Sequence, residues 1–143
     1  MIKGDLIHPE ILKVLASAGH GAKILIADGH FPFSTGAAKN VPRVYLNFAT
    51  GKLNTIDILS EIVKAVPIES TTAVVPDDGN EPAIFEEYRK LLPEDIEINK
   101  VKRFGFYDAV NTPELALVIA SAEKRTYACI LLTIGIREFE VNK

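Results

Sequence analysis

Short apolar runs of strand length alternate with segments of helical periodicity along most of the chain, and this alternation limits the possible fold more than any other feature. Strand-like runs at 23–27, 71–75 and 115–120 are separated by segments whose apolar residues recur with a helical period, at 55–66 and 82–92. Strands that alternate with helices usually pair in parallel and carry helices on both faces. The sequence therefore predicts a three-layer α/β/α domain around a largely parallel, mixed central sheet.

Capping and turn residues set the other expected elements. A His-Pro-Glu sequence at 8–10 opens a helix, and we expect Gly19 to end it in the left-handed conformation. The segment 28–42 is rich in glycine and proline, which predicts a long loop. The remaining expectations are strands over 43–48, 97–102 and 127–132 and a short helix over 104–110.

Length, charge and the absence of long apolar runs narrow the class of protein. The length of 143 residues is typical of one domain, and we expect residues 1–143 to form a single one. A net charge of −3 and the lack of a basic run disfavour a nucleic-acid partner. No apolar run is long enough to span a bilayer, and residues 1–5 lack the apolar core of a signal peptide, so we expect no membrane partner.

The cysteine content and the hydropathy bear on location and assembly. A single cysteine, Cys129, excludes an internal disulfide and is consistent with a reducing, cytoplasmic location. The mean hydropathy of +0.15 is slightly high for a small monomer. This apolar excess favours surface that is buried between copies of the chain.

Two clusters of glycine and titratable residues flank the strand expected at 23–27: Gly19-His20-Gly21 precedes it, and Asp28-Gly29-His30 follows it. Histidine is well suited to proton transfer at neutral pH, so His20 is a candidate proton donor or acceptor. Asp28, at the carboxyl end of a strand, could bind a hydroxyl group or orient a histidine. Each residue also has an ordinary structural interpretation: a helix cap for His20, an Asx turn for Asp28 and a plain loop position for His30.

Other chemistries find little support in the sequence. His20, Asp28 and His30 could offer metal ligands, but further convergent ligands are missing, so we expect no metal. No glycine-rich phosphate loop follows a strand, and no Gly-x-Ser-x-Gly elbow is present. These absences disfavour nucleotide binding and covalent hydrolysis.

A third group of residues, Arg103, Tyr107 and Tyr127, adds polar ends to otherwise apolar segments. An arginine and two tyrosines can hydrogen-bond hydroxyl groups while they offer flat apolar faces, a combination that suits a sugar. The alternative is that both tyrosines are core or interface residues whose hydroxyl groups reach water.

Four motifs follow one another in a distinctive order: Gly-His-Gly at 19–21, Ala-Asp-Gly-His-Phe-Pro at 27–32, Arg-Phe-Gly-Phe-Tyr at 103–107 and Tyr-Ala-Cys-Ile-Leu at 127–131. Together they resemble the D-ribose pyranase / L-fucose mutarotase family, over nearly the whole chain. The resemblance implies an isomerase that interconverts the cyclic forms of a free monosaccharide and needs neither a cofactor nor a metal.

The resemblance also implies roles for individual residues. His20 matches the family's proton donor, and Asp28 matches its sugar-binding aspartate, which we also expect to assist catalysis. The other substrate-binding positions implied are His30, Glu69, Arg103, Tyr107, Tyr127 and Cys129. The His-Phe-Pro sequence at 30–32 and the arginine at 103 are similar to the fucose branch rather than the ribose branch. Family members form pentameric rings that pair into decamers, with sites near subunit boundaries, so self-association is expected.

The chain departs from the family pattern at two places. Cys129 stands where the family usually has an asparagine, and Ala22-Lys23 replaces an acidic pair. A thiol is a poor substitute for an amide that both donates and accepts hydrogen bonds. If that asparagine binds a sugar hydroxyl in the family, we expect a different preferred sugar or weaker binding here. The alternatives are a D-ribose pyranase, a non-catalytic sugar-binding or sugar-transport accessory protein, and a purely structural ring subunit.

Overall fold

A single mixed sheet forms the centre of the protein, seen here in a computed structural model that describes residues 1–140. The described residues contain six strands, in the spatial order β2-β5-β1-β6-β3-β4. Only β6 runs antiparallel to its neighbours, and the other pairs are parallel, as predicted. The strands are β1 (Lys23–Ala27), β2 (Arg43–Tyr45), β3 (Ile68–Val74), β4 (Ile98–Val101), β5 (Leu115–Ala120) and β6 (Ile130–Ile134).

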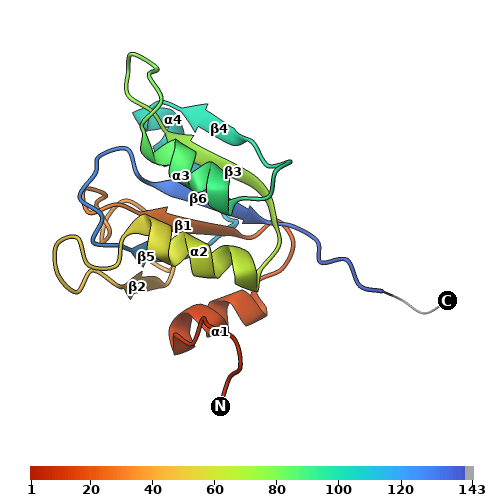
Figure 1. Ribbon diagram of the computed structural model, residues 1–143. Coiled ribbons are helices and arrows are strands. Elements are labelled where there is room, and N and C mark those ends of the chain that lie inside the picture. The colour runs from red at the N-terminus through yellow and green to blue at the C-terminus, as the bar shows by residue number, and fades with distance from the viewer. Residues whose placement is uncertain (141–143) are drawn as a thin grey trace.

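Three helices cover one face of the sheet: α1 (Pro9–Ser17), α2 (Thr55–Ala65) and α3 (Ile84–Leu91). Their buried residues, such as Leu59 and Phe85, form one hydrophobic cluster with Ile24 and Ile26 of β1. In Figure 1, α2 and α3 lie across the front of the strands. Burial of this cluster fixes the orientation of β1, whose side chains alternate between the two faces.

The opposite face is covered by α4 (Arg103–Val110) and by the loop that follows β1. Leu25 and Ala27 of β1 pack there with Phe31 from the loop and with Phe106 and Val110 from α4. The three-layer α/β/α architecture is therefore confirmed, although a long loop supplies part of the third layer.

The first helix begins as predicted but ends differently. The His8 Nδ1 accepts a hydrogen bond from the backbone N–H of Ile11 at 3.4 Å, which caps the helix. The helix ends at Ser17, and the prediction that Gly19 takes the left-handed conformation is wrong. Instead Gly21 has a φ of +83°, in a turn closed by the N–H of Ala22 and the C=O of Gly19. A turn of this kind needs a positive φ at its third residue, so the glycine is required at 21.

Three predicted strand boundaries differ from the structure. β3 begins at Ile68 rather than at 71, and β2 ends at Tyr45 rather than at 48. β6 begins at Ile130, three residues later than predicted, because Tyr127 has a φ of +58° that no strand residue can adopt. The short helix expected over 104–110 is present as α4, one residue longer.

The residues predicted to form the site lie at two opposite edges of the sheet. The parallel strands end at what we call the carboxyl edge, where Asp28 follows β1, Arg103 follows β4 and Cys129 precedes β6. At the opposite, amino edge, His20 precedes β1 and Glu69 lies near the start of β3. None of the helices among residues 1–140 is long and apolar enough to cross a membrane.

Candidate functional site

A cavity of about 300 Å³ opens at the carboxyl edge, against α4. Six of the eight residues predicted to form the site line it: Asp28, His30, Arg103, Tyr107, Tyr127 and Cys129. Phe31, Val74, Phe106 and Thr126 complete the lining. Residues from four separate segments thus meet here because the carboxyl ends of parallel strands lie at the same edge.

Asp28 is the most firmly held member of this pocket, with only 3% of its surface exposed. Its Oδ1 accepts a hydrogen bond from the N–H of His30 at 2.9 Å, and its Oδ2 accepts one from the N–H of Ala128 at 3.0 Å. The first bond is the Asx turn that the sequence also allowed. The second joins the loop after β1 to the loop before β6. Each carboxylate oxygen retains acceptor capacity toward the pocket.

The guanidinium group of Arg103 lies beside two aromatic rings, with its Cζ 5.6 Å from the ring centroid of Phe104 and 5.8 Å from that of Tyr107. Contact with aromatic faces restrains a long side chain and leaves its N–H donors free. The Tyr107 ring also packs against Phe31, at 6.0 Å between centroids. This side of the pocket therefore combines hydrogen-bond donors with an apolar surface.

His30 lies between the pocket and a second cavity of similar volume, which Asn47, Thr50 and Lys124 help to line. Its Nε2 is 3.1 Å from the backbone carbonyl of Lys124. A carbonyl can only accept, so Nε2 carries the hydrogen and Nδ1 of the neutral ring is left as an acceptor. The contact restrains the ring at the boundary of the two cavities.

Cys129 is buried at the base of the pocket, and its sulfur accepts a hydrogen bond from the N–H of Asp28 at 3.3 Å. Burial, followed by the negative charge of Asp28, raises the pKa of this thiol well above its usual range. A thiol that stays protonated is a poor nucleophile. Cys129 therefore contributes shape and low polarity to the pocket.

His20 and Glu69, the two remaining predicted residues, lie at the amino edge. Nε2 of His20 is 2.7 Å from Oε2 of Glu69, and 55% and 41% of the two side chains are exposed. This contact replaces the helix cap that the sequence left open as an alternative. The five residues of β1 separate His20 from Asp28 by about 16 Å of strand. Within one chain, Asp28 therefore does not orient His20.

Sequence reasoning missed Thr126, which lines the pocket, and Glu123, which lines the second cavity. Both belong to the segment between β5 and β6, directly after the carboxyl end of a parallel strand. The rule that working residues gather at such ends could have identified them. Among residues 1–140, no three or more histidine, cysteine, aspartate or glutamate side chains cluster in a way that could hold a metal ion.

The chain is similar to known proteins in both its sequence and its fold. The model of the RbsD / FucU transport protein family matches residues 1–137. The chain belongs to this family. An L-fucose mutarotase of Actinobacillus pleuropneumoniae serotype 5b (strain L20) is 33% identical in an alignment of 144 residues. The alignment covers 95% of this chain and 97% of that protein. The RbsD / FucU chain described here is thus related along its length to a sugar mutarotase.

Two solved structures of the RbsD / FucU family extend the comparison. The fucose mutarotase of Streptococcus pneumoniae, solved in complex with L-fucose, has a TM-score of 0.77 and 25% identity, over 92% of this chain and 95% of that one. RbsD of Bacillus subtilis, complexed with D-ribose, has a TM-score of 0.83 at 22% identity, over 96% of this chain and all of that one. At that lower identity the likeness speaks for the fold alone.

Proposed function

We propose that this protein is a cofactor-independent mutarotase that interconverts the anomers of a free monosaccharide, with L-fucose as the first candidate. The observation that carries the proposal is the carboxyl-edge pocket, where the Asp28 carboxylate, the Arg103 guanidinium and two tyrosines surround an apolar floor. Charged and hydroxyl groups can hydrogen-bond sugar hydroxyls, and the floor can contact the apolar face of a sugar ring. Relatedness to an L-fucose mutarotase supports the same reaction.

Anomer exchange requires that the sugar ring opens and closes again on the other face of the carbonyl carbon. Opening removes the proton of the anomeric hydroxyl and adds a proton to the ring oxygen. In our proposal His20 donates the proton to the ring oxygen, and a water molecule accepts the proton of the anomeric hydroxyl. Asp28 holds the sugar, and Arg103, Tyr107 and Tyr127 fix its orientation. General acid–base catalysis contributes typically ~10²–10⁴-fold. That factor suffices because sugars also exchange anomers without an enzyme.

Because His20 lies at the amino edge, the proposal requires a second copy of the chain. We propose that His20 and Glu69 of a neighbouring copy approach the carboxyl-edge pocket, in a ring-shaped pentamer that pairs into a decamer. Large apolar side chains near the carboxyl edge support such a contact, since Phe48 is 86% and Phe104 75% exposed. Burial of these side chains against a second copy would remove apolar surface from water, which favours association.

The base of the pocket bears on the choice of sugar. Phe31, Val74, Phe106 and Cys129 are apolar, and Cys129 occupies the place of an amide that the family pattern favours. An apolar base suits the methyl group of a 6-deoxy sugar such as L-fucose better than the hydroxyls of D-ribose. D-ribose pyranase activity is therefore the alternative within the same reaction class.

A second candidate function is sugar binding without catalysis, as in a transport accessory protein. The observation in its favour is that the pocket of one chain lacks His20, while both oxygens of Asp28 are bonded to backbone N–H groups. We also propose a cytoplasmic location, because the chain's one cysteine is a buried free thiol.

Saturation-transfer NMR of L-fucose, with D-ribose in parallel, tests the proposal. Faster exchange between the anomers of L-fucose in the presence of the protein is the expected result. Faster exchange of D-ribose alone would keep the reaction and change the sugar. Binding without faster exchange would favour the accessory role, and an absence of both effects would refute the proposal for these sugars.

A further inference from the structure

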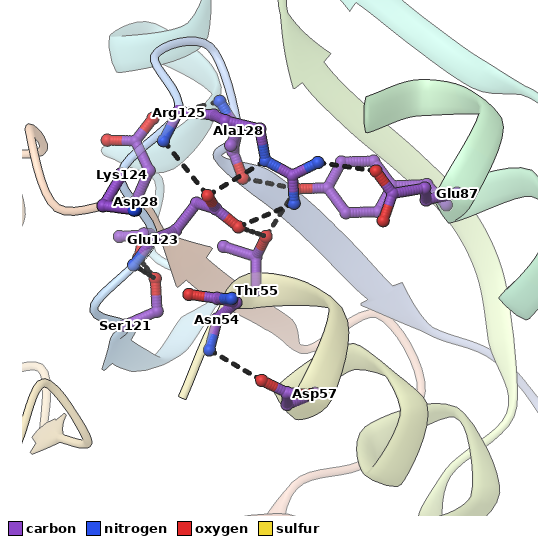
Figure 2. Close-up of polar contacts among 12 residues, drawn as sticks. Asp28, Asn54, Thr55, Asp57, Glu87, Ser121, Glu123, Lys124, Arg125 and Ala128 are labelled. Atoms are coloured by element: carbon purple, nitrogen blue, oxygen red, sulfur yellow. Dashed lines mark hydrogen bonds and ion pairs between the residues drawn. The ribbon is translucent and has the colours of Figure 1, made fainter. Parts of the chain in front are cut away.

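An ion pair between the buried carboxylate of Glu123 and the more exposed guanidinium of Arg125 lies in the segment that carries Tyr127. Glu123 is only 3% exposed, and Arg125 contacts both of its oxygens, from Nε to Oε1 at 3.0 Å and from Nη2 to Oε2 at 2.9 Å. The backbone N–H of Arg125 also donates to Oε1, and Thr55 donates to Oε2 (Figure 2). Burial alone would raise the pKa of Glu123, but the bonds from Arg125 lower it below its usual value. A charged, multiply bonded carboxylate therefore fixes this part of the loop.

The same arginine connects the loop to α3. Nη1 of Arg125 donates to Oε1 of Glu87 at 2.5 Å, so the guanidinium bridges two carboxylates, as Figure 2 shows. The next residue of α3, Tyr88, is fully buried and donates its hydroxyl hydrogen to the backbone carbonyl of Ala128. Burial raises the pKa of Tyr88, so this donor stays protonated.

These contacts hold the chain on both sides of Tyr127. Its φ of +58° lies in the left-handed region, which carries a steric cost for a residue with a Cβ. Such a conformation persists only where the surrounding structure fixes it. Arg125 anchors the chain two residues earlier, and Ala128 is bonded through its carbonyl to Tyr88 and through its N–H to Asp28.

Glu123 also anchors the loop that carries Asp28. Its backbone carbonyl accepts a hydrogen bond from the N–H of Gly29 at 2.9 Å. A Cβ at position 29 would lie only 2.8 Å from that oxygen, so the two loops approach more closely than a side chain would allow. The position of Glu123 thus determines where two sides of the pocket stand relative to each other.

We infer that Glu123 and Arg125 are positioning residues, which hold Tyr127 in its left-handed conformation over the pocket and hold Ala128 against Asp28. Neither residue lines the pocket, so neither contacts a sugar bound there. Arg125 acts on the reaction through the Tyr127 hydroxyl, and Glu123 acts by holding Arg125. The inference rests on the proposed function only in taking the pocket as the sugar site.

The first test measures structure and needs no activity. Amide hydrogen exchange is followed by NMR in wild type, in E123Q and in R125A. We expect the Ala128 amide to exchange at least about tenfold faster in both variants while strand amides in β1 and β5 stay protected. R89A is the matched control, because Arg89 lies in α3 and likewise bridges two glutamates, Glu81 and Glu86, and none of the three lines the pocket. Unchanged protection of Ala128 in both variants would overturn the inference.

The second test is a double-mutant cycle in the exchange assay. Y127F removes the Tyr127 hydroxyl, and R125A removes the guanidinium that holds the loop. Each should raise KM about tenfold, with a smaller change in kcat. If Arg125 acts through Tyr127, R125A in the Y127F background adds less than about twofold, because the group that it positions is already gone. Multiplying effects would overturn the inference. A wild-type protein that exchanges neither sugar would refute the proposed function, and the amide measurement would still decide the positioning role.

Discussion

The two edges of the sheet carry the predicted site residues in opposite states. At the carboxyl edge, Asp28 is almost fully buried and both of its oxygens accept backbone hydrogen bonds. At the amino edge, about half of each side chain is exposed in His20 and Glu69, and the ring of His20 contacts the carboxylate of Glu69. Within one chain, the fold therefore holds the carboxyl-edge part of the proposed site in place and leaves the amino-edge part exposed.

This difference shows that the fold of one chain fixes the carboxyl-edge residues but not the amino-edge pair. A buried carboxylate that holds two loops together contributes to stability as well as to chemistry, because loss of either bond leaves a buried N–H without a partner. An exposed histidine–glutamate pair contributes little to stability, on the order of 0–1 kcal/mol. The pair is instead accessible to a neighbouring molecule. Substitutions at the two edges should therefore differ in their effect on the stability of the protein.

The largest expected effect on rate comes from His20→Gln. Loss of the proposed proton donor should lower catalysed anomer exchange by about 10²–10⁴-fold, to near background. Because the side chain is exposed, the melting temperature and sugar binding should stay close to wild type. Saturation-transfer NMR, thermal unfolding and a sugar titration check the three expectations. Full activity in this variant would remove His20 from the mechanism.

Asp28→Asn should reduce both activity and stability. The amide keeps one acceptor oxygen and turns an NH₂ group toward one of the two backbone donors, His30 or Ala128. An unsatisfied buried donor costs roughly 1–3 kcal/mol, which lowers Tm by about 3–10 °C in a chain of this size. Differential scanning calorimetry compares the Tm of Asp28→Asn with that of His20→Gln. An equal Tm for both variants would contradict the contrast between the edges.

Glu69→Gln should have a smaller effect, a loss of less than about tenfold in rate without a change in Tm. The glutamine can still contact His20 but no longer attracts its charged form. A fall in kcat at constant KM would assign Glu69 to His20, whereas a rise in KM would assign it to the sugar.

The smallest expected effect is an acid sensitivity that belongs to the carboxyl edge. The pKa of Glu123 is lower in the folded chain than in the unfolded one, since bonds from Arg125 outweigh burial. Its stabilising contribution is therefore present above the unfolded value of about 4.5 and is lost as the pH falls through the folded value. Urea unfolding between about pH 3 and 6 should show a weaker pH dependence in E123Q than in wild type. Identical slopes would mean that Glu123 does not titrate with unfolding.

Much of the fold followed from local patterns, because strands such as 23–27 and 115–120 are apolar and bounded by turn residues. The errors arose where tertiary contacts override local signals. Nothing in the sequence around Tyr127 indicates a left-handed residue, and that conformation delays the start of β6. Likewise Ile68 joins β3 through its pairing with β6, which no local pattern reveals.

The motifs grouped six residues that share the carboxyl-edge pocket, but they did not reveal that His20 and Glu69 lie apart from that pocket. Motif resemblance grouped His20 with Asp28, and only the strand between them shows that one chain keeps them apart. The positioning pair was missed for a different reason. Glu123 and Arg125 look like ordinary charged loop residues until the burial of Glu123 and the approach of α3 are known.

The central claim, that a working site combines two copies of the chain, is tested most directly by complementation. His20→Gln and Asp28→Asn are co-expressed in equal amounts, and anomer exchange is compared with that of each variant alone. A random assembly unites an intact His20 with an intact Asp28 at roughly one interface in four, so we predict recovery of about a quarter of wild-type activity. Mixed assemblies that remain at the background rate of the separate variants would contradict a shared site.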